Sequence, residues 1–249
     1  MIFQVGVTGF NHREWRGDFY PSVLGERDML AYYANRFGAV EIETSFLRMP
    51  SLTTVDRWVY ETPDNFRFSL QVPRRITHQK RLKDIAEPVQ DLLKSIKRMG
   101  RKLGALKFQL PATLKANSER LKHLFNVIPA TIPVAIEFNH ASWFDDNHFD
   151  CLRNHNAALV LSDSNSSIST GQVAGGENAQ SGADFRTADW TYRYMTRGVY
   201  DTSTLQQLLS QSTCSTQSRG MLFFTHPRNG PHIASHFQQI VPKTRRVFR

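Results

Sequence analysis

Eight short apolar runs recur along the 249-residue chain, and nearly every one ends in a polar or charged side chain. Buried parallel strands are typically continuous apolar runs, because helices cover both faces of the sheet that they form. In a (β/α)8 barrel the carboxyl ends of the strands converge on one face, and ligands bind there. The pattern therefore predicts both a barrel and the place of its site. The runs are Phe3–Val7, Ala39–Ile42, Phe66–Leu70, Ala105–Phe108, Val134–Ile136, Ala157–Leu161, Trp190–Met195 and Met221–Phe224.

Segments with apolar residues at helical spacing lie between most of these runs. One interval differs, because residues 164–189 are polar, rich in Gly and Ser, and without periodicity. We expect a single domain over residues 1–249, a distorted TIM-type (β/α)8 barrel in which a long loop near 164–189 replaces one helix. The expected helices are Asp28–Phe37, Leu52–Thr62, Ala86–Lys102, Ser118–Val127, Phe144–Asn154, Thr202–Ser210 and Pro231–Ile240.

The composition narrows the class of protein. No apolar run approaches the roughly 20 residues that a membrane helix needs, so we expect no membrane partner. The N-terminus lacks the basic and apolar regions of a signal peptide. Cys151 and Cys214 are the only cysteines, which argues against a disulfide scaffold and is typical of a cytoplasmic protein.

The net charge of +9 is the one unusual compositional feature. Such a charge favours an anionic partner, for example nucleic acid or a phosphorylated ligand. It serves solubility equally well.

Three carboxylates are expected at strand ends, namely Glu41, Glu137 and Asp163. Converging carboxylates can hold a divalent cation or work as an acid–base pair, and alternatively each caps a helix or pairs with a nearby arginine. Three such acids repel one another unless a cation or a shared proton intervenes, so a divalent metal is a candidate cofactor. His78 could assist near neutral pH, or hold a loop by a structural hydrogen bond. The chain has no His-Glu-x-x-His and no Cys-x-x-Cys, which leaves the metal ligands unspecified.

Several separate motifs follow one another along almost the whole chain. They are V-G-V-T-G-F at 5–10, V-E-I-E-T-S-F at 40–46, I-T-H-Q-K-R-L at 76–82, F-Q-L-P at 108–111 and E-F-N-H-A-S-W-F at 137–144. In this order they resemble the YecE-like family of uncharacterised proteins, also called domain of unknown function seventy-two. The resemblance implies a TIM-type barrel and no established reaction. The positions that carry over from the family are Glu41, Thr77, His78, Gln109, Pro111, Glu137, His140, Trp143, Asp163 and Tyr192.

The chain also departs from the family pattern. The family commonly has Lys where Gln71 stands, Arg where Asn139 stands, and Arg in the seventh strand where Tyr194 stands. A site that has lost its typical cations has a different preference for anions. The departures therefore imply a divergent member, with altered specificity or lost catalysis.

The function we favour from the sequence is an enzyme or former enzyme, such as a hydrolase or isomerase, acting on a small polar or phosphorylated ligand. Glu41, Glu137 and Asp163 would perform the acid–base chemistry, with His78 assisting. One alternative is a nucleic-acid-binding or nuclease-like protein that uses the basic surface and the aromatic residues Trp15 and Trp143. A further alternative is a non-catalytic interaction protein. The candidate ligand-binding residues are Thr8, Arg48, Gln109, His140, Trp143, Tyr192 and His226.

Overall fold

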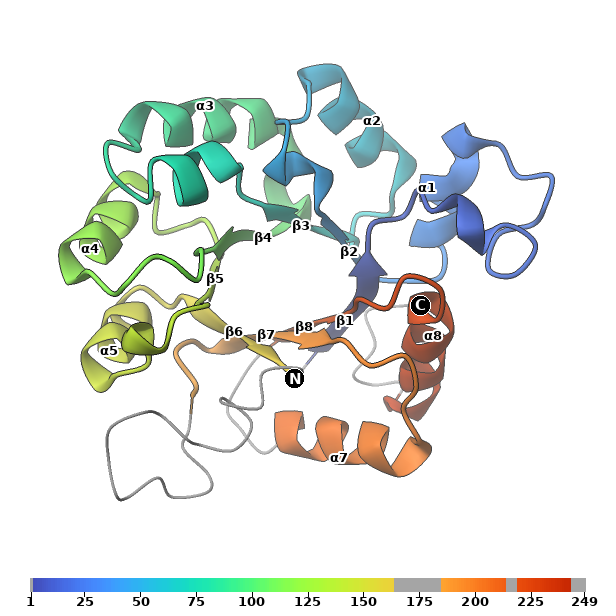
Figure 1. Ribbon diagram of the computed structural model, residues 1–249. Coiled ribbons are helices and arrows are strands. Elements are labelled where there is room, and N and C mark those ends of the chain that lie inside the picture. The colour runs from blue at the N-terminus through green and yellow to red at the C-terminus, as the bar shows by residue number, and fades with distance from the viewer. Residues whose placement is uncertain (1, 164–184, 214–218, 243–249) are drawn as a thin grey trace.

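In the computed structural model, which describes residues 2–163, 185–213 and 219–242, eight parallel strands close into a barrel (Figure 1). Each strand pairs with its neighbours in chain order, and the last pairs with the first. All eight predicted strands are present, so the barrel is confirmed. The strands are β1 Ile2–Thr8, β2 Ala39–Ile42, β3 Arg67–Gln71, β4 Leu103–Gln109, β5 Val134–Glu137, β6 Ala158–Ser162, β7 Trp190–Met195 and β8 Arg219–Phe224.

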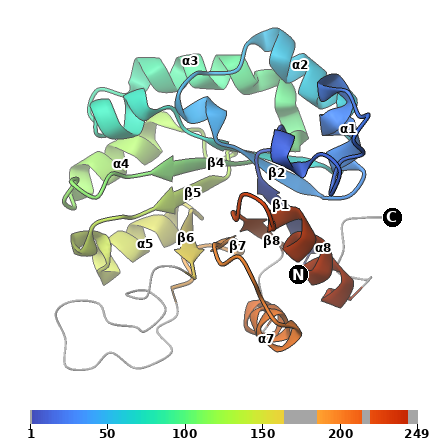
Figure 2. The ribbon, with the colours of Figure 1, turned by 45° about the vertical axis from the view of Figure 1, so that its right-hand side comes forward.

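Helices surround this barrel on the outside (Figure 2). All seven predicted helices are found in the described part of the chain, and four of them begin at a side chain that caps the first turn. The Oγ atom of Ser51 accepts from the amide of Thr54, at 3.1 Å. Asn117, Asp145 and Asp201 do the same for the helices that begin at Ser118, Asp146 and Thr202. The helices are α1 Met29–Ala34, α2 Leu52–Glu61, α3 Ala86–Ile96, α4 Ser118–Val127, α5 Asp146–Asn154, α7 Thr202–Thr213 and α8 Gly230–Ile240.

The long loop predicted near 164–189 falls mostly on residues 164–184, which lie outside the described residues. Among the residues that are described, no helix is both long and apolar enough to cross a bilayer.

The two faces of each strand bury different sets of side chains. Outward residues such as Phe3 pack against the helices, and its ring meets that of Phe237 on α8 edge-on at 6.0 Å. Inward residues form a second cluster, whose side chains are small on one side of the barrel and large on the other. Alanines face inward from β2, β4, β5 and β6, whereas β7 and β8 contribute aromatic rings and a methionine. The large side chains of β7 and β8 can therefore reach across the barrel axis.

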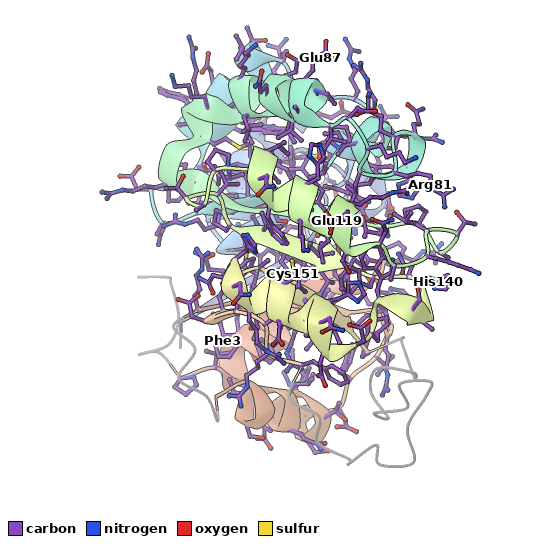
Figure 3. The ribbon with its side chains drawn as sticks, turned by 90° about the vertical axis from the view of Figure 1, so that its left-hand side faces the viewer. Phe3, Arg81, Glu87, Glu119, His140 and Cys151 are labelled. Carbon is purple, nitrogen blue, oxygen red and sulfur yellow. The ribbon has the colours of Figure 1, made fainter. Side chains whose placement is uncertain are left out.

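The loops that follow the strands gather at one end of the barrel. Figure 3 shows Arg81 and His140, from the loops after β3 and β5, on the side of the molecule opposite to Phe3 near the start of β1. Polar side chains at strand ends therefore share one face, as the sequence pattern predicts.

Candidate functional site

A fully buried carboxylate, Glu41 on β2, lies inside the barrel near its carboxyl end. Tyr192 and Tyr194 are two residues apart on β7, so both point inward, and both donate hydroxyl hydrogen bonds to the Glu41 carboxylate. Tyr192 also shares a 2.8 Å hydrogen bond with Ser69 on β3. Burial, followed by the negative charge of Glu41, raises the pKa of each tyrosine well above its ordinary value. Both phenols therefore stay protonated and act as hydrogen-bond donors to Glu41.

Lys107 on β4 supplies the positive charge of this cluster. Its side chain is 3% exposed, and Nζ lies 3.1 Å from Oε1 of Glu41 and 3.3 Å from Oε2 of Glu137. Nζ also donates to the Tyr194 hydroxyl, whereas Oε2 of Glu137 contacts Nζ as an ion pair and has no hydrogen-bond partner among the described residues. Burial alone would lower the pKa of Lys107, but attraction to Glu41 and Glu137 outweighs it and raises the pKa. The ammonium is therefore held charged between two carboxylates.

The cluster continues from the buried interior to the mouth of the barrel. Glu137 at the end of β5 accepts a 3.0 Å hydrogen bond from Nε2 of Gln109, whose Oε1 accepts from Gln71 at 3.1 Å. The Glu137 side chain is 17% exposed, whereas that of Glu41 is 0% exposed. Glu137 is thus the carboxylate of this network that a ligand can reach.

Glu43 and His78 lie at the rim of the same mouth. Burial and the charge of Glu41 raise the pKa of Glu43, partly offset by Lys107 and by His12. Burial and repulsion by Arg74 lower the pKa of His78, against an opposing attraction from Glu137. At neutral pH His78 is consequently an uncharged ring, and its Nδ1 is bonded to the Thr77 hydroxyl at 2.9 Å.

The loop that carries His78 has an unusual backbone. Residues Arg75–Gln79 form a short π-helix, a conformation that is frequent at functional sites. Just after it, Arg81, Leu82 and Asp84 have φ angles of 51°, 63° and 47°, in the left-handed region that non-glycine residues rarely adopt. Strain of this kind persists only where the surroundings enforce it, so the loop is firmly positioned beside the mouth.

Asp163 does not join this network, which corrects our expectation that the three acids share one pocket. It follows β6 on the outward face, because side chains alternate along the strand and Ser162 takes the inward position. Its Oδ1 accepts from the amide and hydroxyl of Thr196, at 2.8 and 2.7 Å, and its Oδ2 accepts from the Tyr200 hydroxyl. Asp163 therefore holds the loop between β7 and α7.

Four other candidate residues are engaged in local structure. Nδ1 of His140 accepts from the amide of Ser142, at the start of a short 3-10 turn. Trp143 is completely buried, stacked on Phe138 at 4.9 Å, and donates to the Leu114 carbonyl oxygen. The remaining two are Thr8, which is 7% exposed at the end of β1, and His226, whose Nδ1 accepts from the Asn229 amide.

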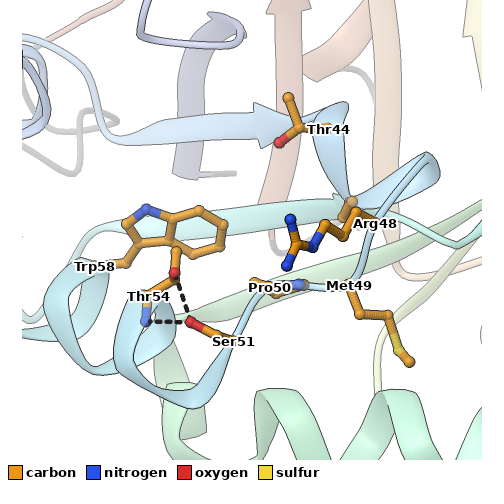
Figure 4. Close-up of a pocket in the computed structure, with 8 residues that line it drawn as sticks. Thr44, Arg48, Met49, Pro50, Ser51, Thr54 and Trp58 are labelled. Atoms are coloured by element: carbon orange, nitrogen blue, oxygen red, sulfur yellow. Dashed lines mark hydrogen bonds between the residues drawn. The ribbon is translucent and has the colours of Figure 1, made fainter.

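Arg48 is not part of the mouth network either. It lines a separate cavity of about 400 Å³ between the loop after β2 and the start of α2, together with Ser51, Thr54 and Trp58 (Figure 4). In the close-up its guanidinium group points toward the side of this cavity formed by Pro50 and Trp58.

Lys107 and Ser69 belong to the network but were not among the sequence candidates. Lys107 sits inside the apolar run Ala105–Phe108, two residues before Gln109. A lysine in the middle of a buried strand is a signal in itself, because a buried charge requires a partner.

No group of three or more His, Cys, Asp or Glu side chains able to hold a metal is found in residues 2–163, 185–213 and 219–242. Glu41 and Glu137 are instead bridged by Lys107. The network can accept or release a proton at Glu137, and it can stabilise negative charge that develops beside the Lys107 ammonium.

The chain matches the family model described as "Protein of unknown function DUF72" over residues 4–248. It belongs to the DUF72 family. The UPF0759 protein YecE of Escherichia coli K12 is 30% identical over 145 residues, which are 58% of this chain and 50% of that protein. The UPF0759 protein YunF of Bacillus subtilis is 25% identical over 158 residues, 60% of this chain and 55% of that one. The chain thus spans about half the length of the curated relatives that it matches.

Solved structures include one with the same fold. The crystal structure of the DUF72 family protein TM1631 from Thermotoga maritima aligns with a TM-score of 0.76 at 22% identity. The alignment covers 96% of this chain and 99% of that one. At this identity the likeness establishes the shared barrel fold.

Proposed function

We propose that this DUF72 barrel is an enzyme that acts on a small polar ligand at the carboxyl end of the barrel. In this proposal Glu137 exchanges a proton with the ligand, and the Lys107 ammonium stabilises the negative charge that develops. Tyr192, Tyr194 and Glu41 hold Lys107 in place from behind. Glu43, whose pKa is raised by burial and by Glu41, is the candidate acid at the rim.

The observation that carries this proposal is the continuous chain of polar contacts from the buried Glu41 to the partly exposed Glu137. Replacing a buried ion pair by apolar residues is often neutral or stabilising, so such a network has little value as a stability device. Perturbed titratable groups beside a mouth are typical of functional sites. The π-helix and the left-handed residues next to His78 also favour a functional site at this mouth of the barrel.

The charge of the mouth also bears on the class of ligand. Glu41, Glu43 and Glu137 face one buried ammonium group, Lys107, and Arg74 adds a positive charge beside His78 at the rim. A phosphorylated ligand would add negative charge there, whereas a neutral or cationic polar ligand would not. We therefore place neutral and cationic compounds ahead of phosphorylated ones.

A panel of neutral, cationic and phosphorylated small compounds would test the proposal by thermal shift, followed by product analysis of every compound that stabilises the chain. We expect neutral or cationic compounds to bind and to be converted. Glu137→Gln should lower turnover by about 100-fold or more, the usual contribution of a positioned acid or base. The exposed Glu119→Gln variant is the matched control. Binding without conversion, or full turnover by Glu137→Gln, would rule out this assignment.

We also propose that a divalent metal can bind at this mouth, and a variant of Lys107 provides the test. The ammonium already contacts both carboxylates that a metal would use. We expect Mn²⁺ to raise the melting temperature of Lys107→Met more than that of the unchanged chain, because the ion would take the place of the ammonium. Equal shifts in the two proteins would mean that the metal binds elsewhere or not at all.

A further inference from the structure

The opposite end of the barrel carries two arginines that the proposed chemistry does not use. Arg67 is the first residue of β3 and Arg219 is the first residue of β8. Arg67 pairs in register with Ala39, and Arg219 with Trp190. Ala39 and Trp190 both belong to the inward-facing cluster, so the two arginine side chains also start toward the barrel interior.

A glycine lets these side chains approach from opposite strands. A Cβ atom added at Gly104 would lie 3.0 Å from Cβ of Arg67 and 2.7 Å from Cε of Met221. Met221 is two residues after Arg219, on the same face of β8. The space that Gly104 leaves open therefore brings the side chains of β3 and β8 together at the amino-terminal mouth.

The two guanidinium groups have backbone, aromatic and acidic neighbours, and the carboxylate that acts on Arg219 is Asp189. Nη1 of Arg67 donates to the backbone carbonyl oxygens of Asp64 and Phe66, at 2.9 Å each. The Arg219 guanidinium lies 4.9 Å from the centre of the Trp190 ring. Both arginines are half-buried. Burial lowers the pKa of both, and repulsion from Arg219 and Arg101 lowers that of Arg67 further. Attraction by Asp189 partly offsets the effect of burial on the pKa of Arg219.

One layer further inside lies an unsatisfied amide. Gln4 on β1 is 6% exposed, and its Oε1 has no hydrogen-bond partner. Rotation of the amide exchanges its oxygen and nitrogen, so Gln4 can offer either an acceptor or a donor to a group that enters the mouth. A buried polar atom without a partner is uncommon in folded proteins and suggests that a further group binds nearby.

We propose that the amino-terminal mouth of the barrel binds a compact oxyanion of the phosphate type between Arg67 and Arg219. The planar guanidinium fork matches two oxygens of a phosphate or carboxylate, and an anion would offset the repulsion between the two cations. The net charge of +9 draws anions toward the chain, whereas the excess of carboxylates makes the carboxyl-terminal mouth unfavourable for them. This site is independent of the proposed acid–base chemistry.

The phosphate group could belong to a free small molecule or to a nucleic acid, and the experiment has an arm for each. The melting temperature is measured with inorganic phosphate and with pyrophosphate, against sodium chloride at the same ionic strength. A labelled single-stranded oligonucleotide is titrated in parallel, with phosphate as competitor. We expect phosphate or pyrophosphate to stabilise the chain in a saturable manner that chloride does not reproduce.

Charge-neutralising variants locate the effect. Arg219→Gln and Arg67→Gln should each weaken phosphate binding by about tenfold, as the loss of a charge-assisted hydrogen bond would. Arg27→Gln, at an exposed position on the 3-10 turn Glu26–Asp28, removes the same charge and should change binding less than about twofold. Tighter binding of the oligonucleotide, lost in the same two variants, would assign the phosphate to nucleic acid. A phosphate effect matched by chloride, or one that survives in both variants, would overturn the proposal.

Discussion

The two mouths of this barrel hold charge in opposite ways. At the carboxyl-terminal mouth the buried Lys107 is paired with Glu41 and Glu137, at 3.1 and 3.3 Å. At the amino-terminal mouth Arg67 and Arg219 lie half-buried and repel one another, and Asp189 offsets this only partly at Arg219. Charges that satisfy one another make the folded chain depend on each member, whereas like charges make it depend on a group that binds from outside. This difference can be tested by removing charges from each end.

The largest effect is expected from Lys107→Met. The substitution leaves Glu41 completely buried without its cation, and breaking a buried pair in this way typically costs about 3–5 kcal/mol of unfolding free energy. Urea denaturation at pH 7 measures this loss. Lys115→Met, at an exposed position in the loop after β4, is the matched control and should change stability by less than about 0.5 kcal/mol.

The double variant Lys107→Met with Glu41→Gln sharpens this test. Because it removes both charges, it should be more stable than the two single losses added together would predict. The pH dependence has a defined sign as well. The pKa of Lys107 is raised in the folded chain, so its stabilising contribution is present below the ordinary value of 10.5 and is lost as pH rises through the higher folded value. If the Lys107→Met variant is as stable as the unchanged chain, the ion pairs of Lys107 do not stabilise the fold.

A smaller loss is expected from Tyr194→Phe. The Tyr194 hydroxyl donates to Glu41 and accepts from Lys107, so its removal deprives two charged groups of a hydrogen bond. Such bonds contribute about 1.5–3 kcal/mol each, and the total loss should lie in that range because both charged groups keep other partners. Tyr60→Phe is the control, since Tyr60 is 91% exposed. If both variants lose the same amount in urea denaturation, the Tyr194 hydroxyl does not support the ion pair.

At the other mouth the coupling should have the opposite sign. In a double-mutant cycle of Arg67→Gln and Arg219→Gln, without phosphate and at low salt, each single variant relieves the same repulsion. The double variant relieves it once, so it should be less stable than the sum of the single effects by about 0.5 kcal/mol. Saturating phosphate should abolish this coupling. A coupling of attractive sign would contradict the idea that the two cations repel one another.

Much of this arrangement could be predicted from the sequence, because the alternation of apolar runs and amphipathic segments is a local property. All eight strands were predicted, and Glu41, Glu137, Gln109 and Tyr192 came together as the strand-end rule requires. Asp163 did not join them, because it lies one position after the inward-facing residue at the end of β6. The apolar run Ala157–Leu161 does not reveal which of its following residues turns inward, and Ser162 takes that place.

The cation at the centre of the network, Lys107, could not be predicted from the rule that site residues lie at strand ends. Lys107 lies inside a run read as apolar, and its partners on β2, β5 and β7 are distant in sequence. Comparison with the family pattern pointed to lost cations at Gln71, Asn139 and Tyr194, whereas the cation that contacts Glu41 and Glu137 is Lys107. Its contacts depend on which side chains cross the barrel axis, and that is decided by packing across the interior.

The smallest expected effect concerns Glu43 at the rim. Its pKa is raised, by burial and by repulsion from Glu41, above the ordinary value of 4.5, so the folded chain holds this proton more tightly than the unfolded chain does. The contribution of Glu43 is therefore favourable below pH 4.5 and is lost as pH rises through the folded value. Glu43→Gln should consequently be neutral or more stable by a few tenths of a kcal/mol at pH 7, because one side of this rim carboxylate is open to solvent, which screens its charge. The difference should vanish near pH 4.

The control variant Glu119→Gln should be less stable than the unchanged chain at pH 7, since Glu119 pairs with Lys122 at 3.1 Å in the first turn of α4. Urea denaturation of both variants at the two pH values checks this, and a clear loss of stability in Glu43→Gln at pH 7 would show that Glu43 is an attractive partner in the mouth.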